Sequence, residues 1–571
     1  MYGFSALLSS QQYTFMTEGK SEICLSNPGK YLCFNNMINK FVEDRIFCDD
    51  DEFMIVLDGI VLNKNKLIDH KIDWKTFFIT SLKANGFDFI ESLRGSFSGI
   101  VYDKRTDEYT IFSDHIGSRF IYYIQQDTTL FVSSQIRECY AFLKQNNINY
   151  HLVTANAYLL LTYGYMLEDH TLCDKIKKIE PGCYLKFKKG KLKQIQYSML
   201  DNTPDMSISK EDAMELMDSE FRRVISMEFE KDDEYGYRHV VALSGGLDSR
   251  MVSWVAHDMG YNNQLNMTFS QSGYFDQTIP QQIASDLKHD WIFKSLDGGW
   301  WLQDVDKITV LTGGNVLYPG QAHGYSFESI VDFSSDLGII HSGQIGDVAF
   351  SSPYGNKYRN PYDFGAGAYS LKLLHKLEGS LVLHADYPNR EMAQLYYRSF
   401  GANYYSFNIE YNMTEAYSPF QDIDLLANMF KIPVEIRQNY KLYFDWILKK
   451  YPDSANYIWE KTRAKITRKW GFVSINGNKV KIETIPQRIL HKIGLVRAYG
   501  GITSKNNMNP YAYYINSNPV LKLWIDNYFK NNIDRVNDVE LKDDILTIWK
   551  GNDIMLKLQA ISLLSAIKIF F

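Results

Sequence analysis

Six consecutive residues, SGGLDS at 244–249, combine small, hydroxylated and acidic side chains directly after the apolar run HVVAL. A loop of small residues that leads into a helix offers backbone N–H groups and a positive dipole end to phosphate. Ser244, Gly245, Gly246 and Ser249 fit this description. The pattern is neither G-x-G-x-x-G nor G-x-x-x-x-G-K-[ST], so dinucleotide and Walker-type sites match poorly. A simple glycine turn between a strand and a helix is the alternative interpretation.

A second stretch, SGQIGD at 342–347, repeats this design about a hundred residues later. It also follows an apolar run and places small residues before an acid, Asp347. Carboxylates among phosphate groups are typical ligands of magnesium, which usually takes one or two of them from the protein. An aspartate after a strand can instead cap the next helix, which is the alternative for Asp347.

Four apolar runs predict the sheet that positions these loops: HVVAL, QLNMTFS, WIFKSL and GIIHSG, at 239–243, 264–270, 291–296 and 338–343. Helical stretches separate them, and this alternation predicts a doubly wound parallel sheet. Ligands of such sheets bind outside the carboxyl ends of the strands. Ser209 and Asp212 match a capping box, so a helix is expected to open this region. The last hundred or so residues are expected to be helical.

The first part of the chain is predicted to be rich in antiparallel strands. Apolar residues alternate from about residue 50 to 140, with polar turn tips at 104–107 and 125–128, and another hairpin turns at Lys189-Gly190. The polar stretch DNTPDMSIS at 201–209 is the expected boundary. We therefore predict one domain over residues 1–200 and a second over 201–571.

Composition excludes several classes of protein. The 571 residues carry 61 Lys and Arg against 67 Asp and Glu, a net charge of −6 that does not favour nucleic-acid binding. The six cysteines form no C-x-x-C pair, so we expect them to be reduced and structural. We find neither a signal peptide nor a membrane-length apolar stretch, which favours a cytoplasmic protein with no membrane partner.

The two loops resemble known signatures. SGGLDS is similar to the pyrophosphate-binding loop of the ATP pyrophosphatases, which cleave ATP between the α and β phosphates. SGQIGD resembles the second signature of asparagine synthetases, Ser-Gly-Glu-Gly-x-Asp-Glu. The resemblance implies that residues 244–249, Leu247 included, bind ATP, and that Asp248 and Asp347 share Mg²⁺. Gln344 and Val348 replace the family's glutamates, which puts the family's acceptor chemistry in doubt.

The same family supplies a candidate catalytic lysine. EAYSPFQD at 415–422 resembles its Glu-x-Arg-x-Pro-Phe-x-Asp segment, and YPDSANYIWEKTRAK at 451–465 stands where the family has a lysine that bridges the adenylate phosphate and the developing oxyanion. By this match the lysine is Lys461, with Lys465 as the second choice; a solvated surface lysine is the alternative. Asp276 aligns with a family position but also suits a helix N-cap.

The first domain resembles the class II glutamine amidotransferase domain through LRGSFSGIVYDKRTDEYTIFSDHIGSRFIYY at 93–123. The family's nucleophile is a cysteine after the initiator methionine, whereas this chain has Tyr2, a phenol that cannot replace an N-terminal thiol. Asp58 and Ile60 stand in the family's Asn-Gly-Glu segment, and Arg94 replaces an aspartate that holds the amino group of glutamine. We therefore expect no glutamine hydrolysis.

The predicted fold is α/β: an antiparallel, β-rich, amidotransferase-like (Ntn-type) sandwich, then a doubly wound parallel-sheet ATP-pyrophosphatase domain with a helical C-terminal part. The resemblance is to asparagine synthetase relatives without glutaminase, such as β-lactam synthetases and lasso-peptide cyclases. It implies an ATP-dependent ligase that adenylates a small-molecule or peptide carboxylate and condenses it with an amine, releasing AMP and pyrophosphate. A homo-oligomer or biosynthetic partner proteins are compatible with this function. The alternatives are an asparagine synthetase using free ammonia and a non-catalytic scaffold subunit.

Overall fold

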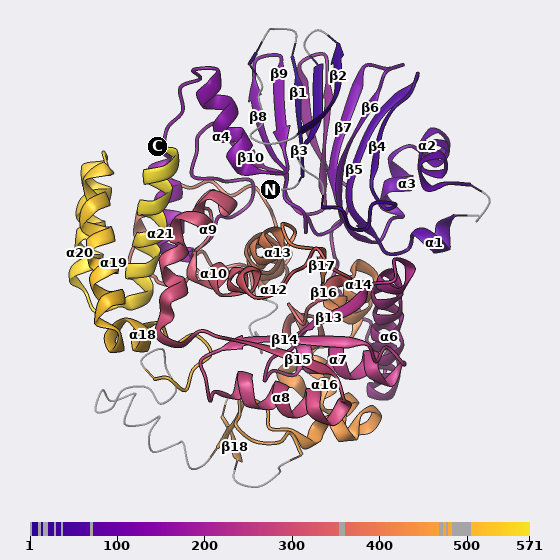
Figure 1. Ribbon diagram of the computed structural model, residues 1–571, viewed down its shortest axis with the longest axis vertical. Coiled ribbons are helices and arrows are strands. Elements are labelled where there is room, and N and C mark those ends of the chain that lie inside the picture. The colour runs from indigo at the N-terminus through magenta and orange to yellow at the C-terminus, as the bar shows by residue number, and fades with distance from the viewer. Residues whose placement is uncertain are drawn as a thin grey trace.

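The computed structural model describes residues 3–9, 13–14, 21–27, 30–35, 38–68, 72–352, 360–467, 472–475, 478–481 and 504–571. Within them, an N-terminal part built on antiparallel sheets precedes a part built on a parallel sheet, and the chain ends in helices (Figure 1). The predicted fold class is confirmed. The boundary between residues 200 and 201 stays a prediction, and Tyr2 lies outside the described residues.

Two six-stranded antiparallel sheets form the N-terminal sandwich. The first, in the order β10-β8-β9-β1-β3-β2, comprises β1 (Gly3–Leu8), β2 (Ser21–Asn27), β3 (Lys30–Asn35), β8 (Tyr122–Gln126), β9 (Thr129–Ser133) and β10 (Lys177–Lys178). The second, in the order β12-β11-β7-β6-β5-β4, comprises β4 (Ile46–Asp49), β5 (Phe53–Val61), β6 (Gly95–Asp103), β7 (Glu108–Ser113), β11 (Cys183–Lys188) and β12 (Lys191–Gln196). Buried side chains of both sheets, such as Phe4 and Val56, share one apolar cluster. The sheets therefore pack face to face.

The predicted hairpins are present. Residues 104–107 join β6 to β7, residues 127–128 join β8 to β9, and Lys189-Gly190 joins β11 to β12. Lys189 and Gly190 both have positive φ, of 49° and 75°, which is the backbone of a type I′ turn and matches the twist of the paired strands.

Helix α6 (Lys210–Glu234) links the two parts and begins where the sequence predicts. Ser209 is its N-cap and accepts a hydrogen bond from the Asp212 N–H at 3.1 Å, while the Ser209 hydroxyl donates to the Asp212 carboxylate at 2.6 Å. The apolar side of α6 is buried through Met217, Phe221 and Val224.

The parallel sheet has the strand order β15-β14-β13-β16-β17, and every pairing in it is parallel. Its strands are β13 (Arg238–Ala242), β14 (Gln264–Ser270), β15 (Asp290–Ser295), β16 (Leu337–His341) and β17 (Ala416–Tyr417). The chain runs from β13 outward through β14 to β15 and then returns to β16 on the other side of β13. The topological switch point, where ligands of such sheets bind, therefore lies between β13 and β16.

Helices surround these sheets. They are α1 (Lys64–Leu67), α2 (Trp74–Asn85), α3 (Phe87–Glu91), α4 (Ile136–Gln145), α5 (Thr154–Tyr163), α7 (Asp248–Asp258), α8 (Phe275–Leu287), α9 (Val305–Thr312), α10 (Pro319–Tyr325), α11 (Gly346–Phe350), α12 (Arg390–Gln394), α13 (Tyr405–Glu410), α14 (Ile423–Lys431), α15 (Val434–Arg437) and α16 (Lys441–Lys450). A separate hairpin pairs β18 (Phe472–Ile475) with β19 (Asn478–Lys481).

The C-terminal helices are α18 (Tyr511–Ser517), α19 (Pro519–Asn532), α20 (Val539–Lys550) and α21 (Ile554–Phe570), as the sequence predicts (Figure 1). Helix α21 is buried on nearly all sides and packs on α5 and α9, and the ring of Phe570 stacks on that of Tyr140 at 4.0 Å. Helix α21 thus packs against helices of both the N-terminal part and the parallel-sheet part. None of the helices in the described ranges has the length and apolar character that crossing a membrane requires.

Candidate active site

The loop 244–247 connects β13 to α7 and lies at the carboxyl end of β13, as predicted. Internal hydrogen bonds hold it. The Ser244 N–H donates to the Ser249 hydroxyl at 3.0 Å, the two hydroxyls lie 2.9 Å apart, and the Gly246 N–H donates to the Ser244 hydroxyl at 3.2 Å. Leu247 is buried and directly precedes the helix. The loop is therefore a compact turn with its polar groups mutually bonded.

The two glycine-containing loops are in direct contact. A Cβ atom on Gly346 would lie 2.6 Å from Cγ of Asp248, and one on Gly343 would lie 2.3 Å from the backbone nitrogen of Ser249. Distances this short exclude any side chain unless the backbone shifts. The glycines of SGQIGD thus allow the loop after β16 to approach the start of α7, which brings Asp347 toward Asp248.

Asp248 and Asp347 form a pair of half-buried acids. Burial raises the pKa of Asp248 to about 8, and the negative charge of Asp347 contributes to this shift. Burial also raises the pKa of Asp347, against the opposing effect of the Lys461 and Arg398 charges. The Oδ1 atom of Asp248 is buried and has no hydrogen-bond partner in the described part of the chain. The Tyr443 hydroxyl lies beside this carboxylate. A buried carboxylate oxygen that is not well satisfied by hydrogen bonds is suited to a cation.

Lys461 lies close enough to the two acids for its charge to act on both. Its charge lowers the pKa of both Asp248 and Asp347. Its Nζ donates to the Tyr440 hydroxyl at 2.9 Å and lies 4.5 Å from the centre of the Tyr440 ring. Lys465, the second choice from the sequence, is exposed, and so is Lys461. Of the two lysines, Lys461 is the one whose charge lowers the pKa of the acids. The structure thus brings together Asp248, Asp347 and Lys461 from three distant segments.

Asp276 corrects one interpretation of the sequence. It is not an N-cap, because α8 begins at Phe275 after Tyr274 and Asp276 lies inside the first turn. Its carboxylate accepts a hydrogen bond from the Gly245 N–H at 2.7 Å and so fixes the SGGLDS loop. Burial raises the pKa of Asp276 to about 7. The capping alternative for Asp347 is likewise wrong, since Ile345 precedes α11.

Sequence reasoning missed several neighbours of these groups. Glu460 donates its N–H to the Gly245 carbonyl at 3.3 Å, and its carboxylate accepts from the Tyr274 hydroxyl. The hydroxyl of Tyr443 is buried beside Asp248. Glu460 adjoins Lys461 in sequence, which could have drawn attention to it. Tyr443 lies in an aromatic stretch that looks like ordinary core, so no signal marked it.

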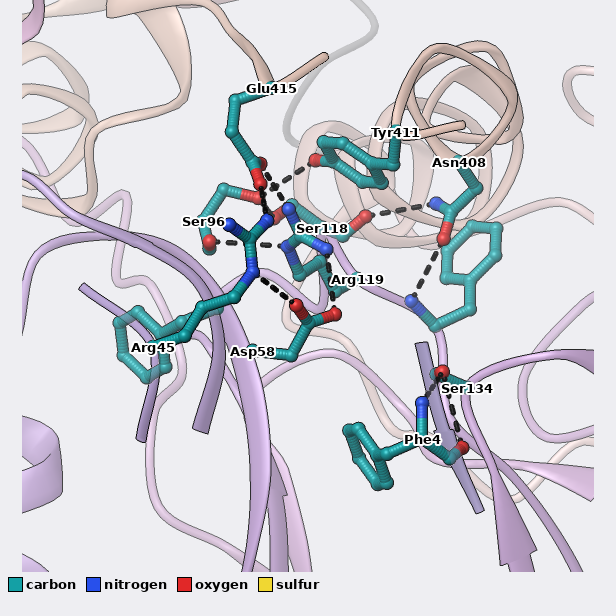
Figure 2. Close-up of polar contacts among 12 residues, drawn as sticks. Phe4, Arg45, Asp58, Ser96, Ser118, Arg119, Ser134, Asn408, Tyr411 and Glu415 are labelled. Atoms are coloured by element: carbon teal, nitrogen blue, oxygen red, sulfur yellow. Dashed lines mark hydrogen bonds and ion pairs between the residues drawn. The ribbon is translucent and has the colours of Figure 1, made fainter. Parts of the chain in front are cut away.

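Asp58, one of the residues singled out in the N-terminal part, lies at its boundary with the parallel-sheet part. Asp58 accepts from Arg45 Nε at 2.9 Å and from Arg119 Nη1 at 3.1 Å, and both arginines also donate to Glu415, directly before β17 (Figure 2). Burial opposes ionisation of Asp58, yet Arg119 and Arg45 hold its pKa below the ordinary value. We call these four residues the arginine–carboxylate cluster. Its charges are balanced and buried.

Arg94 forms an ion pair across the two parts of the chain, and Ile60 is part of the apolar core. The guanidinium of Arg94 binds Asp424 of α14 through two hydrogen bonds of 2.7 and 3.0 Å, and Ile60 is fully buried in the core. At the start of the chain, the Phe4 N–H donates to the Ser134 hydroxyl at 2.9 Å (Figure 2). The sequence indicated that Arg94 departs from the amidotransferase pattern but pointed to no partner for it.

Comparison with known proteins gives one family match. The family model described as "Glutamine amidotransferase domain" matches residues 46–198, which include β4 through β12. No curated protein sequence matches the chain. The match supports an amidotransferase-related N-terminal part and, through it, an enzyme; it does not extend to the parallel-sheet part.

Solved structures give weaker likenesses. One is glutamine phosphoribosylpyrophosphate amidotransferase from B. subtilis, complexed with ADP and GMP, at 12% identity and a TM-score of 0.21 over 41% of this chain and 51% of that chain. The alignment therefore spans about half of that enzyme. Another is described as the allosteric regulatory enzyme of purine biosynthesis, at 9% identity and a TM-score of 0.23 over 51% of this chain and 74% of that one. Likenesses this low carry no argument about activity.

Proposed function

We propose that this protein is an ATP-dependent, AMP-forming amide ligase that adenylates a carboxylate and condenses it with an amine from a source other than glutamine. The observation that carries the proposal is the half-buried Asp248–Asp347 pair with raised pKa values and Lys461 beside it, at the switch point of a parallel sheet and next to the SGGLDS loop. Two neighbouring acids with raised pKa values are costly for a fold and are common at functional sites.

The donor set fits Mg²⁺. Two carboxylates, one with a buried oxygen that lacks a hydrogen bond within the described residues, are hard oxygen ligands of the kind that magnesium takes beside phosphates. When bound, the ion would neutralise phosphate charge during cleavage between the α and β phosphates. Asp248 and Asp347 would hold it. Phosphate oxygens at the loop would replace the hydrogen bonds that the Ser244 and Ser249 hydroxyls now make with each other.

Lys461 supplies the positive charge that this chemistry needs. Attack of a carboxylate on the α phosphorus, and then of an amine on the acyl adenylate, each passes through a state with more negative charge on oxygen. A cation already held in place by Tyr440 can stabilise that charge without reorganising. Tyr440 thus acts as a positioning residue for Lys461.

The proposal assigns no glutaminase activity to the N-terminal part. Tyr2 stands where the family has its nucleophile, and Arg94, in place of the ammonium-binding aspartate, is committed to Asp424. Asp58 is likewise neutralised by Arg45 and Arg119. The amine must then come from free ammonia or from a second substrate. The carboxylate substrate is a small molecule or a peptide, as the sequence predicts.

The test is pyrophosphate release from ATP and Mg²⁺ over a panel of carboxylates, each with ammonia, glutamine or a set of primary amines. Three proteins are compared: wild type, Asp248→Asn, and Asp258→Asn as the matched control at the other end of α7, where Asp258 is exposed and pairs with Arg222. We expect turnover with ammonia or an amine but not with glutamine, retained in Asp258→Asn and lost in Asp248→Asn.

Other outcomes decide between the alternatives. Turnover that requires glutamine would contradict the assignment of the N-terminal part. Turnover with aspartate and ammonia alone would identify an ammonia-dependent asparagine synthetase. Absence of ATP binding would leave a non-catalytic scaffold.

A further inference from the structure

A second polar cluster lies inside the parallel-sheet part, and the proposed function does not use it. His239 of β13, His341 of β16 and Asp232 of α6 are buried together, and one ligand atom from each lies within 4.8 Å of the others. The exposed fraction of their side chains is 4% for His239 and 0% for His341 and Asp232. We call these three residues the His–His–Asp cluster.

The three side chains converge on one point. Asp232 Oδ2 lies 2.8 Å from His341 Nε2 and 3.0 Å from His239 Nδ1. The other oxygen of Asp232 accepts from the Ile339 N–H at 2.8 Å, which fixes the carboxylate. A Cβ on Gly338 would lie 2.1 Å from Asp232 Oδ1, so a glycine there makes room for it. Two imidazole nitrogens and one carboxylate oxygen thus face the same small volume.

The outer nitrogens of both histidines face further carboxylates. His341 Nδ1 lies 2.6 Å from Glu228 Oε1, and His239 Nε2 lies 3.5 Å from Asp233 Oδ1. A carboxylate behind each imidazole is the usual support of metal-binding histidines, because it fixes the tautomer and raises the basicity of the nitrogen that binds. Glu228 is fully buried, and its second oxygen has no hydrogen-bond partner in the described ranges. The surroundings of the cluster therefore include a carboxylate oxygen that no hydrogen bond from the described residues satisfies.

We propose that the His–His–Asp cluster binds a divalent transition-metal ion of the zinc class. Two imidazoles with a carboxylate are a donor set that zinc prefers over magnesium or calcium. Tetrahedral bonds of about 2.0–2.1 Å put ligand atoms about 3.3 Å apart. The two spacings between nitrogen and oxygen, 2.8 and 3.0 Å, are within a few tenths of an ångström of that value, and all three ligand atoms lie within 4.8 Å of one another. This inference is independent of the proposed ligase activity.

The site would be structural. Its ligands come from α6 and from β13 and β16, the two strands that flank the switch point. His341 directly precedes Ser342, the first residue of the loop that carries Asp347. A metal ion here would fasten α6 to the sheet beneath the candidate active site. The cluster is buried on all sides, so a substrate cannot reach it.

The test measures metal in the full-length protein, purified without a histidine tag from zinc-supplemented cells, by inductively coupled plasma mass spectrometry. Wild type, His239→Gln, Asp232→Asn and a matched control, His257→Gln, are compared. His257 is half-buried and hydrogen bonds to another histidine, His289, at 2.9 Å, but it lies outside the cluster. We expect about one zinc per chain in wild type and in His257→Gln, and a loss of tenfold or more in the two cluster variants.

A second measurement keeps the inference testable if the cluster variants do not fold. Wild type refolded with Co²⁺ in place of zinc should show the visible absorption of a low-symmetry Co²⁺ site with nitrogen and oxygen ligands. A folded wild type that contains less than about a tenth of a metal ion per chain and gives no such spectrum would overturn the proposal. The cluster would then be a protonated histidine between two carboxylates. Equal zinc in wild type and both cluster variants would also overturn it.

Discussion

Single residues determine the chemistry of the candidate active site. Asp248 and Asp347 are unfavourable as a pair, since both carry a raised pKa and the charge of Asp347 adds to the shift of Asp248. Lys461 partly compensates for them. The sequence predicts roles for all three from their motifs, but it could not show that Lys461 rather than Lys465 lies near the acids, because that depends on packing against Tyr440.

Replacing Lys461 by Met should reduce kcat about 10²- to 10³-fold, as expected when one group that stabilises transition-state charge is removed. Affinity for ATP should change much less. Steady-state pyrophosphate release measures both. Lys465→Met is the control and should behave as wild type; equal losses in the two variants would contradict the role of Lys461.

Glu410 gives a prediction about stability and pH. Burial raises its pKa to about 8, and its Oε2 has no hydrogen-bond partner in the described part of the chain. From the unfolded value of 4.5 up to about pH 8 the folded state binds more protons than the unfolded state, so the free energy of unfolding falls as pH rises. Glu410→Gln should remove this fall and stabilise the protein by roughly 1–3 kcal/mol at pH 7.5.

Urea denaturation of wild type and Glu410→Gln at pH 5, 6, 7 and 8 checks this. The two proteins should differ least at pH 5 and most at pH 8. A difference that is constant with pH would mean that Glu410 is already ionised in the folded protein.

At the scale of elements, the sequence predicted the strands that hold the loops. The four apolar runs correspond to β13, β14, β15 and β16 within one or two residues. The sequence did not predict β17, because a strand of two residues shows no periodicity. It predicted the C-terminal helices but not the elements on which they pack. The N-cap alternatives for Asp276 and Asp347 failed because the helices begin at other residues, which local sequence does not determine.

The contact between the two loops predicts that Gly346→Ala is damaging. Its Cβ would push on Asp248, and overpacking of this kind costs about 1–3 kcal/mol. Affinity for ATP with Mg²⁺ should fall at least about tenfold while the circular dichroism spectrum is unchanged. Gly320→Ala is the control, because a Cβ there has no atom within 4 Å. Similar affinity in the two variants would show that the loops do not need their present spacing.

At the scale of the whole molecule, the arginine–carboxylate cluster and the Arg94–Asp424 pair connect the N-terminal part to the parallel-sheet part. The departures from the amidotransferase pattern in the sequence marked Asp58 and Arg94. Glu415, which shares Arg45 and Arg119 with Asp58, and Asp424, which binds Arg94, lie more than three hundred residues further along the chain, so only the tertiary structure could show these connections.

The two connections should differ in strength. Glu415→Gln leaves two buried arginines with one carboxylate and should lower the free energy of unfolding by about 3–5 kcal/mol. Asp424→Asn breaks a pair whose side chains are 22% and 44% exposed and should cost less than about 1 kcal/mol. Urea midpoints of both variants measure this. Equal effects would mean that the arginine–carboxylate cluster does not hold the two parts together.

Binding of ATP in the presence of Mg²⁺, measured by isothermal titration calorimetry on wild type, Asp248→Asn and Asp258→Asn, needs no knowledge of the carboxylate or amine. We predict that wild type and Asp258→Asn bind alike and that Asp248→Asn binds at least about tenfold more weakly, a loss of about 1.4 kcal/mol or more. If wild type does not bind ATP, or if all three proteins bind equally, the SGGLDS loop and its acids are not an ATP site and the ligase assignment is wrong.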